Sequence, residues 1–165
     1  MVTDSMTLYL DAGTTVQAMR PLLQERKDLT VVTNDLGTAG AFLDHPSVDL
    51  ICVGGRIDVA NQSMIGRLAA LTLAELSLDL AVISTSSWDA KHGITTPVEA
   101  KIDAERAAME AATESVLLAD SGRFGHFAKY RVARLDEFDA IITDEALSAE
   151  DVAAVKELGP RVVVG

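Results

Sequence analysis

Residues 8–15, Leu8-Tyr9-Leu10-Asp11-Ala12-Gly13-Thr14-Thr15, predict a short apolar strand that runs directly into an acidic turn. A helical pattern follows, so the first N–H groups of the new helix have no intrahelical partners. Gly13 permits a tight turn and close approach of a ligand to the backbone. The helix dipole and the two threonine hydroxyls favour an anion at this position. The same residues also fit an ordinary turn with a threonine cap.

Short β-rich runs alternate with longer helical patterns along the rest of the chain. Several of the runs are apolar throughout, as expected for strands that are covered on both faces. The predicted strands are 8–10, 29–33, 48–53, 79–83, 116–119, 140–143 and 161–164. This alternation predicts an α/β fold, with a mostly parallel sheet and helices on both of its faces.

The predicted helices have recognisable start and stop signals. The apolar spacing over Ile65–Leu76 predicts one amphipathic helix. Thr96–Glu99 has the pattern of a capping box and predicts a helix that continues to about Ala112. Ser148 is expected to cap the last helix, and Pro21 to kink or split the first one.

Polar residues follow five of the predicted strands at the point where each strand ends. The carboxyl ends of parallel strands share one edge of a sheet, where ligands of such folds bind. The sequence therefore predicts a binding site at this edge. The residues concerned are Asp11, Gly13 and Thr14; Thr33, Asn34 and Asp35; Gly54, Gly55 and Arg56; Ser84, Thr85, Ser86 and Ser87; and Asp120, Ser121, Gly122 and Arg123.

Composition is that of a globular protein. The 165 residues are 48% hydrophobic, and the mean hydropathy is +0.22, which suits one domain with a sizeable core. No apolar run approaches the roughly 20 residues that a membrane span needs. The first residues lack the features of a signal peptide. Cys52 is the only cysteine and is expected to be buried in its strand. A single cysteine cannot form an intrachain disulfide, which fits a cytoplasmic location.

Net charge is −11 and the isoelectric point is near 4.6. Binding to duplex DNA normally requires a basic face that displaces counterions, so this composition argues against nucleic-acid binding by these residues. A small anionic ligand remains compatible, because it responds to a few local amides and cations.

The motifs at the strand ends, in this order and spacing, resemble the C-terminal effector-binding domain of the DeoR family of bacterial transcription regulators. The resemblance covers nearly the whole chain. It implies a fold similar to ribose-5-phosphate isomerase and the sugar-phosphate deaminases, and a phosphorylated sugar as effector. The matching segments are Leu10–Thr15, Val31–Asn34, Val53–Gly55, Ser63–Gly66, Gly93–Thr96, Lys101 with Met109, Leu118–Phe124 and Ile142–Asp144.

The resemblance also implies an arrangement for the whole regulator. Family members, usually repressors of sugar metabolism, bind operator DNA through an N-terminal winged helix-turn-helix. The first predicted strand here begins by about Thr7. We therefore expect residues 1–165 to form a single effector-binding domain that lacks the winged helix-turn-helix and assembles as a homo-oligomer. Repression would be controlled by unequal effector affinity for two states of the assembly.

Candidate ligand-binding residues come from the strand ends and the resemblance together. We expect the amides at Gly13–Thr15 to hold an anionic group, with Lys101 and Arg123 as cationic partners. The family usually has Lys at the position of Arg123, and the two cations differ in geometry. The other candidates would contact sugar hydroxyls or allow close approach of the backbone. The full set is Asp11, Gly13, Thr14, Thr15, Thr33, Asn34, Gly54, Gly55, Thr85, Ser86, Lys101, Asp120 and Arg123.

Each candidate also has a purely structural interpretation. Asp11 fits a cap of the following turn, and Asn34 with Asp35 fits a helix cap. Lys101 fits a solvated helix position, and Arg123 fits an ion pair with Asp120.

Three function classes follow. General-base chemistry needs a carboxylate near the substrate, and the segment Ser84–Trp88 has none, which favours a binding site without catalytic residues. An isomerase-like enzyme acting on a small sugar phosphate remains the alternative, because Asp11, Asp35 and Asp120 could face the ligand. A domain that serves only in assembly is the third. We expect no metal or cofactor. Gly54-Gly55 does not complete a nucleotide-binding motif. The three histidines lack metal-ligand spacing and are expected at the surface; they are His45, His92 and His126.

Overall fold

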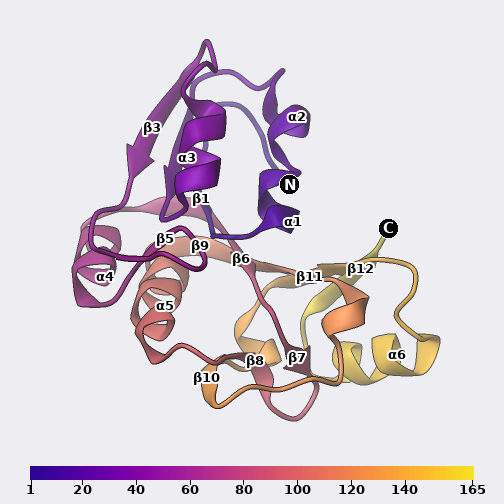
Figure 1. Ribbon diagram of the computed structural model, residues 1–165. Coiled ribbons are helices and arrows are strands. Elements are labelled where there is room, and N and C mark those ends of the chain that lie inside the picture. Colours follow the sequence, from indigo (N-terminus) through magenta and orange to yellow (C-terminus); the bar gives the residue numbers. More distant parts are fainter.

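A seven-stranded sheet lies at the centre of the fold (Figure 1). The computed structural model describes residues 1–165. The strand order is β12-β11-β9-β6-β1-β2-β3, and every pair of neighbours is parallel. This confirms the predicted fold class. The strands are β1 (Thr7–Leu10), β2 (Leu29–Thr33), β3 (Val48–Cys52), β6 (Leu78–Ser84), β9 (Ala112–Leu118), β11 (Ala140–Thr143) and β12 (Arg161–Val164).

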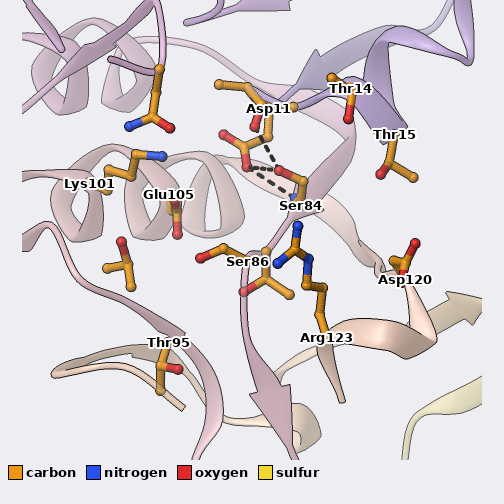
Figure 2. A pocket seen from close by; sticks show the side chains of 15 residues that line it. Asp11, Thr14, Thr15, Ser84, Ser86, Thr95, Lys101, Glu105, Asp120 and Arg123 are labelled. Carbon is orange, nitrogen blue, oxygen red and sulfur yellow. Dashed lines mark hydrogen bonds between the residues drawn. The ribbon is translucent and has the colours of Figure 1, made fainter. Parts of the chain in front are cut away.

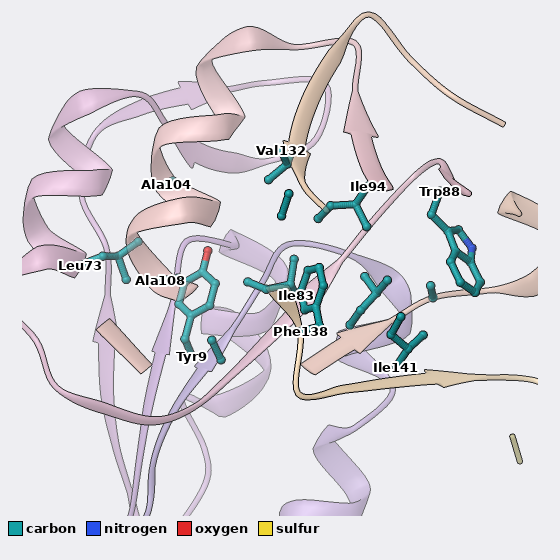
Figure 3. Packing of buried hydrophobic residues seen from close by; sticks show 14 of the residues in the cluster. Tyr9, Leu73, Ile83, Trp88, Ile94, Ala104, Ala108, Val132, Phe138 and Ile141 are labelled. Carbon is teal, nitrogen blue, oxygen red and sulfur yellow. The ribbon is translucent and has the colours of Figure 1, made fainter. Parts of the chain in front are cut away.

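Helices cover both faces of this sheet. Leu8 and Leu10 point into one apolar cluster and Tyr9 into the other, as the alternation of a strand requires. The Leu8 cluster is completed by α1 (Thr14–Gln17), α2 (Arg20–Leu23) and α3 (Leu36–Phe42). The Tyr9 cluster (Figure 3) is completed by α4 (Arg67–Ala74), α5 (Ile102–Ala111) and α6 (Ala149–Glu157).

Smaller elements border the sheet. A hairpin is formed by β4 (Arg56–Asp58) and β5 (Ser63–Ile65). A three-stranded antiparallel sheet is formed by β7 (Trp88–Asp89), β8 (Gly93–Thr96) and β10 (Tyr130–Ala133). Three 3₁₀ turns complete the chain: η1 (Glu99–Lys101), η2 (Ser121–Arg123) and η3 (Leu135–Glu137). None of the helices is both long and apolar enough to cross a membrane.

Two helix boundaries differ from the prediction. Thr96 does not open a helix, because it pairs with Tyr130 at the end of β8 and its hydroxyl accepts from the Val98 N–H; α5 begins only at Ile102. Ile65 belongs to β5. Gly66 has a φ of 83°, which lies outside the right-handed helical range, so α4 begins only after it. Tertiary strand pairing overrides the local helical pattern in both places.

Other local expectations had mixed outcomes. Pro21 does split the first helical segment, into α1 and α2. Cys52 is exposed, contrary to expectation, because β3 is an edge strand. His45 is buried instead of lying on the surface; its ring packs against Phe42, and its Nδ1 accepts from the Ser47 N–H.

The strand order reverses between β1 and β6. From β1 the chain continues to β2 and β3 on one side, whereas β6, β9, β11 and β12 extend on the other. The connections on the two sides leave the sheet on opposite faces, so a crevice opens at the carboxyl ends of β1 and β6. This switch point is where open parallel sheets bind ligands.

Candidate functional site

One polar pocket occupies the switch point (Figure 2). Its volume is about 250 Å³, and Ala12 is the one hydrophobic residue in its wall. Hydroxyl, carboxyl, amide and cationic groups make up the rest, which suits a polar ligand with many oxygens. The lining residues are Asp11, Ala12, Gly13, Thr14, Thr15, Asn61, Ser84, Thr85, Ser86, Thr95, Thr96, Lys101, Glu105, Asp120 and Arg123.

The floor of the pocket is a fixed contact between the ends of β1 and β6. One carboxylate oxygen of Asp11 accepts from both the Ser84 N–H and the Ser84 hydroxyl, each at 3.0 Å. Its other oxygen accepts from the buried Tyr9 hydroxyl at 3.3 Å. A Cβ on Gly13 would lie 2.9 Å from Ser84 Oγ, so only glycine lets the turn approach Ser84 this closely. The two strand ends are therefore locked together.

The turn after β1 presents free donors to the pocket. The N–H groups of Gly13, Thr14 and Thr15 have no backbone acceptor, and the two threonine side chains are exposed. The helix that follows differs from the expectation: α1 has four residues, so few peptide dipoles add up and its macrodipole is small. Individual N–H and hydroxyl donors are what this turn offers to an anion.

Two cations line the pocket without an ion-pair partner. Lys101 lies at the start of α5 and Arg123 at the end of η2, on different walls (Figure 2). No carboxylate oxygen lies within 4 Å of a side-chain nitrogen of either residue. The three ion pairs of the structure lie elsewhere: Arg20–Asp44, His92–Asp89 and Arg134–Asp136. The expected alternative of an Arg123–Asp120 bridge is therefore absent; the Asp120 carboxylate accepts from the Gly122 N–H instead.

Two buried acids face the pocket close to Lys101. Glu105 follows Lys101 by one helical turn on α5 and is 7% exposed. Burial raises the pKa of Glu105 well above its usual value, and the Asp11 charge raises it further, against an opposing effect of Lys101. Burial also raises the pKa of Asp11, while hydrogen bonds from Ser84 and Ala12 oppose the shift. Burial and the same acids raise the pKa of Tyr9 well above its usual value.

Arg123 is held in place from the neighbouring strand. Asp144, just after β11, accepts from the Ser121 N–H at 2.8 Å and from its hydroxyl at 2.6 Å. These bonds lower the pKa of Asp144 to about 2. The Trp88 indole donates to the Asp120 carbonyl at 3.0 Å and packs edge-on against Phe124. The 3₁₀ turn that carries Arg123 is thus fixed at both ends.

The structure brings most of the predicted site residues together. Thr85 and Ser86 follow β6 into the pocket and Asp120 follows β9, beside the predicted turn and the two cations. Whether these residues bind a ligand stays a prediction. The predicted residues that line the pocket are Asp11, Gly13, Thr14, Thr15, Thr85, Ser86, Lys101, Asp120 and Arg123.

Four predicted residues lie outside the pocket, because β2 and β3 end to one side of the switch point. The Thr33 hydroxyl donates to the Leu10 carbonyl, and the Asn34 amide donates to the Met64 carbonyl, so both are buried in structural contacts. Gly55 packs against Ala69, where a Cβ would lie 3.3 Å from its nitrogen. Gly54 is exposed and also does not line the pocket.

Sequence reasoning missed several lining residues. Ala12 and Ser84 belong to predicted strand ends but were not selected. Glu105 could have been found, because it follows Lys101 at the i, i+4 spacing that places two side chains on one helix face. Thr95 and Thr96 belong to the short strand β8, and Asn61 lies in the turn between β4 and β5; these segments have no strong periodic signal.

Fold and pocket together define a class: parallel α/β domains with a polar, cation-containing pocket at the switch point. The chain matches the family described as "DeoR C terminal sensor domain" over residues 1–145. It therefore belongs to this family, as the resemblance of its sequence motifs predicted.

Similar proteins carry regulatory names. The chain is 41% identical to the uncharacterized HTH-type transcriptional regulator YgbI of Escherichia coli, over 89% of this chain and 57% of that protein. It is 35% identical to an uncharacterized HTH-type transcriptional regulator of Haemophilus influenzae, over 96% of this chain and 61% of that protein. It is 30% identical to the HTH-type transcriptional repressor GlcR of Bacillus subtilis, over 87% of this chain and 55% of that protein. The chain thus spans about 60% of the length of these relatives.

Solved structures confirm the fold at low sequence identity. Ribose 5-phosphate isomerase A of Methanocaldococcus jannaschii superposes with a TM-score of 0.52 at 15% identity, over 75% of this chain and 48% of that chain. RipA of Yersinia pestis superposes with a TM-score of 0.52 at 10% identity, over 86% of this chain and 41% of that chain. These similarities bear on architecture alone.

Proposed function

We propose that this sensor domain binds a phosphorylated sugar as the effector of a transcription regulator. The observation that carries the proposal is the pair Lys101 and Arg123, which line a hydroxyl-rich pocket and have no carboxylate partner. Unpaired cations in a polar pocket favour an anion, and Arg can bind a phosphate through two hydrogen bonds. The free N–H groups of Gly13–Thr15 supply further donors.

In the whole protein, this domain would control DNA binding carried by another segment. The net charge of −11 is unsuited to contact with DNA phosphates, whereas the relatives are named HTH-type regulators. We propose that a helix-turn-helix segment outside these residues contacts operator DNA, that the protein is a homo-oligomer in the cytoplasm, and that effector binding shifts its equilibrium between two states.

A sugar-phosphate isomerase is the second candidate. The observation in its favour is that three carboxyl groups line the pocket, those of Asp11, Glu105 and Asp120. A general base must be ionised and free to accept a proton. Asp11 already accepts three hydrogen bonds, and the pKa of Glu105 is raised well above its usual value by burial, so these two buried acids are poor bases. Asp120 is exposed, and its carboxylate accepts from the Gly122 N–H. Binding without turnover fits these environments better.

The test is the melting temperature of the chain against matched pairs of compounds with and without phosphate. The panel includes ribose with ribose 5-phosphate, glycerol with glycerol 3-phosphate, and hexoses with their 6-phosphates. A ligand that binds only the native state stabilises it by about 2.7 kcal/mol at a hundredfold excess over its Kd. A shift confined to phosphorylated members supports the proposal, and turnover of an aldose or ketose phosphate supports the isomerase.

The double variant Lys101→Ala with Arg123→Ala tests the assignment of the phosphate site. We expect it to abolish the shift caused by phosphorylated compounds, while Arg67→Ala with Lys156→Ala, at two exposed cations outside the pocket, leaves it intact. A phosphate-dependent shift that persists in the first double variant would place the phosphate elsewhere.

A further inference from the structure

Glu105 is a buried acid that lines the pocket and has no hydrogen-bond partner within the protein. Its side chain projects from α5 into the pocket beside Lys101 (Figure 2). It is 7% exposed, and no donor of the chain bonds to it. Its carboxyl oxygens are not among the fully buried unpartnered atoms, so they are open to the pocket and can pair with a group that enters it.

Hydrogen bonds distinguish the two buried acids of the pocket, Asp11 and Glu105. Asp11 accepts from the Ser84 N–H, the Ser84 hydroxyl and the Tyr9 hydroxyl, and each of these bonds favours its ionised form. Glu105 accepts none, so nothing comparable stabilises its negative charge. Lys101 lies near both acids, and one cation offsets one carboxylate. These contacts favour the ionised form at Asp11 and the neutral form at Glu105.

We propose that Glu105 is a ligand-contacting residue that acts as a neutral carboxylic acid, donating its proton in a hydrogen bond to an oxygen of the bound ligand. The proposal rests on the proposed function, because it concerns the same pocket. It narrows the class of ligand from any phosphorylated sugar to an anionic compound that has an acceptor oxygen within reach of α5.

A coupling between ligand binding and protons follows from this role. When Glu105 ionises, the pocket gains a second negative charge beside Asp11, and the donor is lost. Binding of an anion above the pKa of Glu105 must then be accompanied by uptake of one proton. The charged and titratable groups that face Glu105 are Asp11 and Tyr9 from β1 and its following turn, and Lys101 from its own helix.

The experiment is isothermal titration calorimetry with ribose 5-phosphate and glycerol 3-phosphate between about pH 7 and pH 9. This range lies above the second pKa of a phosphate monoester, about 6, so the ligand charge is constant. We expect the Kd to rise by about tenfold per pH unit once the pH exceeds the pKa of Glu105. Heats measured in buffers of different ionisation enthalpy should report proton uptake approaching one per ligand.

Variants separate this role from a structural one. Glu105→Gln keeps a neutral donor, so its Kd should be close to that of the wild type at low pH and should not change with pH. Glu105→Leu, which cannot donate, should bind more weakly throughout. Asp103→Asn, the same charge change at an exposed position of α5, should keep the wild-type slope. Equal slopes in the wild type and Glu105→Gln, or tighter binding as the pH rises, would refute the role of Glu105.

A measurement on the ligand-free protein tests the protonation of Glu105 separately from ligand binding. The ¹³C signal of the Glu105 carboxyl, assigned by its loss in Glu105→Gln, should titrate well above the range of an ordinary glutamate. Titration in the ordinary range would overturn the inference even if phosphorylated sugars bind. Absence of binding by every phosphorylated compound would overturn the proposed function, and with it the role of Glu105 in ligand contact.

Discussion

At the scale of single residues, the contact between Gly13 and Ser84 determines the shape of the pocket floor. Gly13→Ala would place a Cβ 2.9 Å from Ser84 Oγ, and we expect a loss of about 1–3 kcal/mol in unfolding free energy, with weaker ligand binding. Gly40→Ala is the matched control, because nothing lies within 4 Å of its added Cβ in α3; it should stabilise by about 0.4–1 kcal/mol. Urea unfolding measures both.

A double variant tests the cause of that loss. Adding Ser84→Ala to Gly13→Ala removes the hydroxyl oxygen that the new methyl group meets, so the two changes together should destabilise less than their sum. Additive losses would mean that the turn is damaged for another reason.

Glu105 should also make the stability of the domain depend on pH. Its pKa is raised in the folded state, so between the unfolded and folded pKa values the native state binds more protons, and stability falls as the pH rises through this window. Glu105→Gln removes the effect. The unfolding free energy of Glu105→Gln, relative to that of the wild type, should therefore be higher at pH 8 than at pH 5. Asp103→Asn is the control. If the difference between Glu105→Gln and the wild type were the same at both pH values, the raised pKa would be contradicted.

At the scale of elements, η2 positions Arg123 only because Asp144 holds Ser121. Asp144→Ala removes both hydrogen bonds, so we expect weaker binding of a phosphorylated ligand and a small change in melting temperature. Asp136→Ala, which removes the carboxylate paired with Arg134 outside the pocket, is the control and should leave binding unchanged. Unchanged affinity in Asp144→Ala would show that η2 keeps its position without this contact.

The same scale shows how far the sequence predicts the structure. All seven strands of the main sheet were predicted, because their short apolar runs are rich in β-branched residues, are bounded by turn residues and alternate with longer helical patterns. The small antiparallel strands were missed, since β7 and β5 have two and three residues and depend on tertiary pairing. In α4, Ala69 and Leu73 are buried but Leu68 is 64% exposed, so the buried face is narrower than the apolar spacing over Ile65–Leu76 indicates. The pocket residues of the small strands were missed for the same reason.

At the scale of the whole molecule, a net charge of −11 opposes the approach of an anionic ligand, although two cations line the pocket. Salt screens this long-range repulsion, with a Debye length of about 8 Å at 0.15 M. The association rate of a sugar phosphate should therefore increase modestly from low to physiological ionic strength, as measured by stopped flow. A decrease would mean that the field of Lys101 and Arg123 dominates the approach.

Trp88 is the only tryptophan of the chain, and its indole donates to the carbonyl of Asp120 in the pocket wall. The emission of an indole responds to the hydrogen bonding and polarity around it. The domain thus contains an intrinsic fluorophore one contact away from the pocket wall, so the proposed binding of a ligand can be tested optically on the unmodified chain.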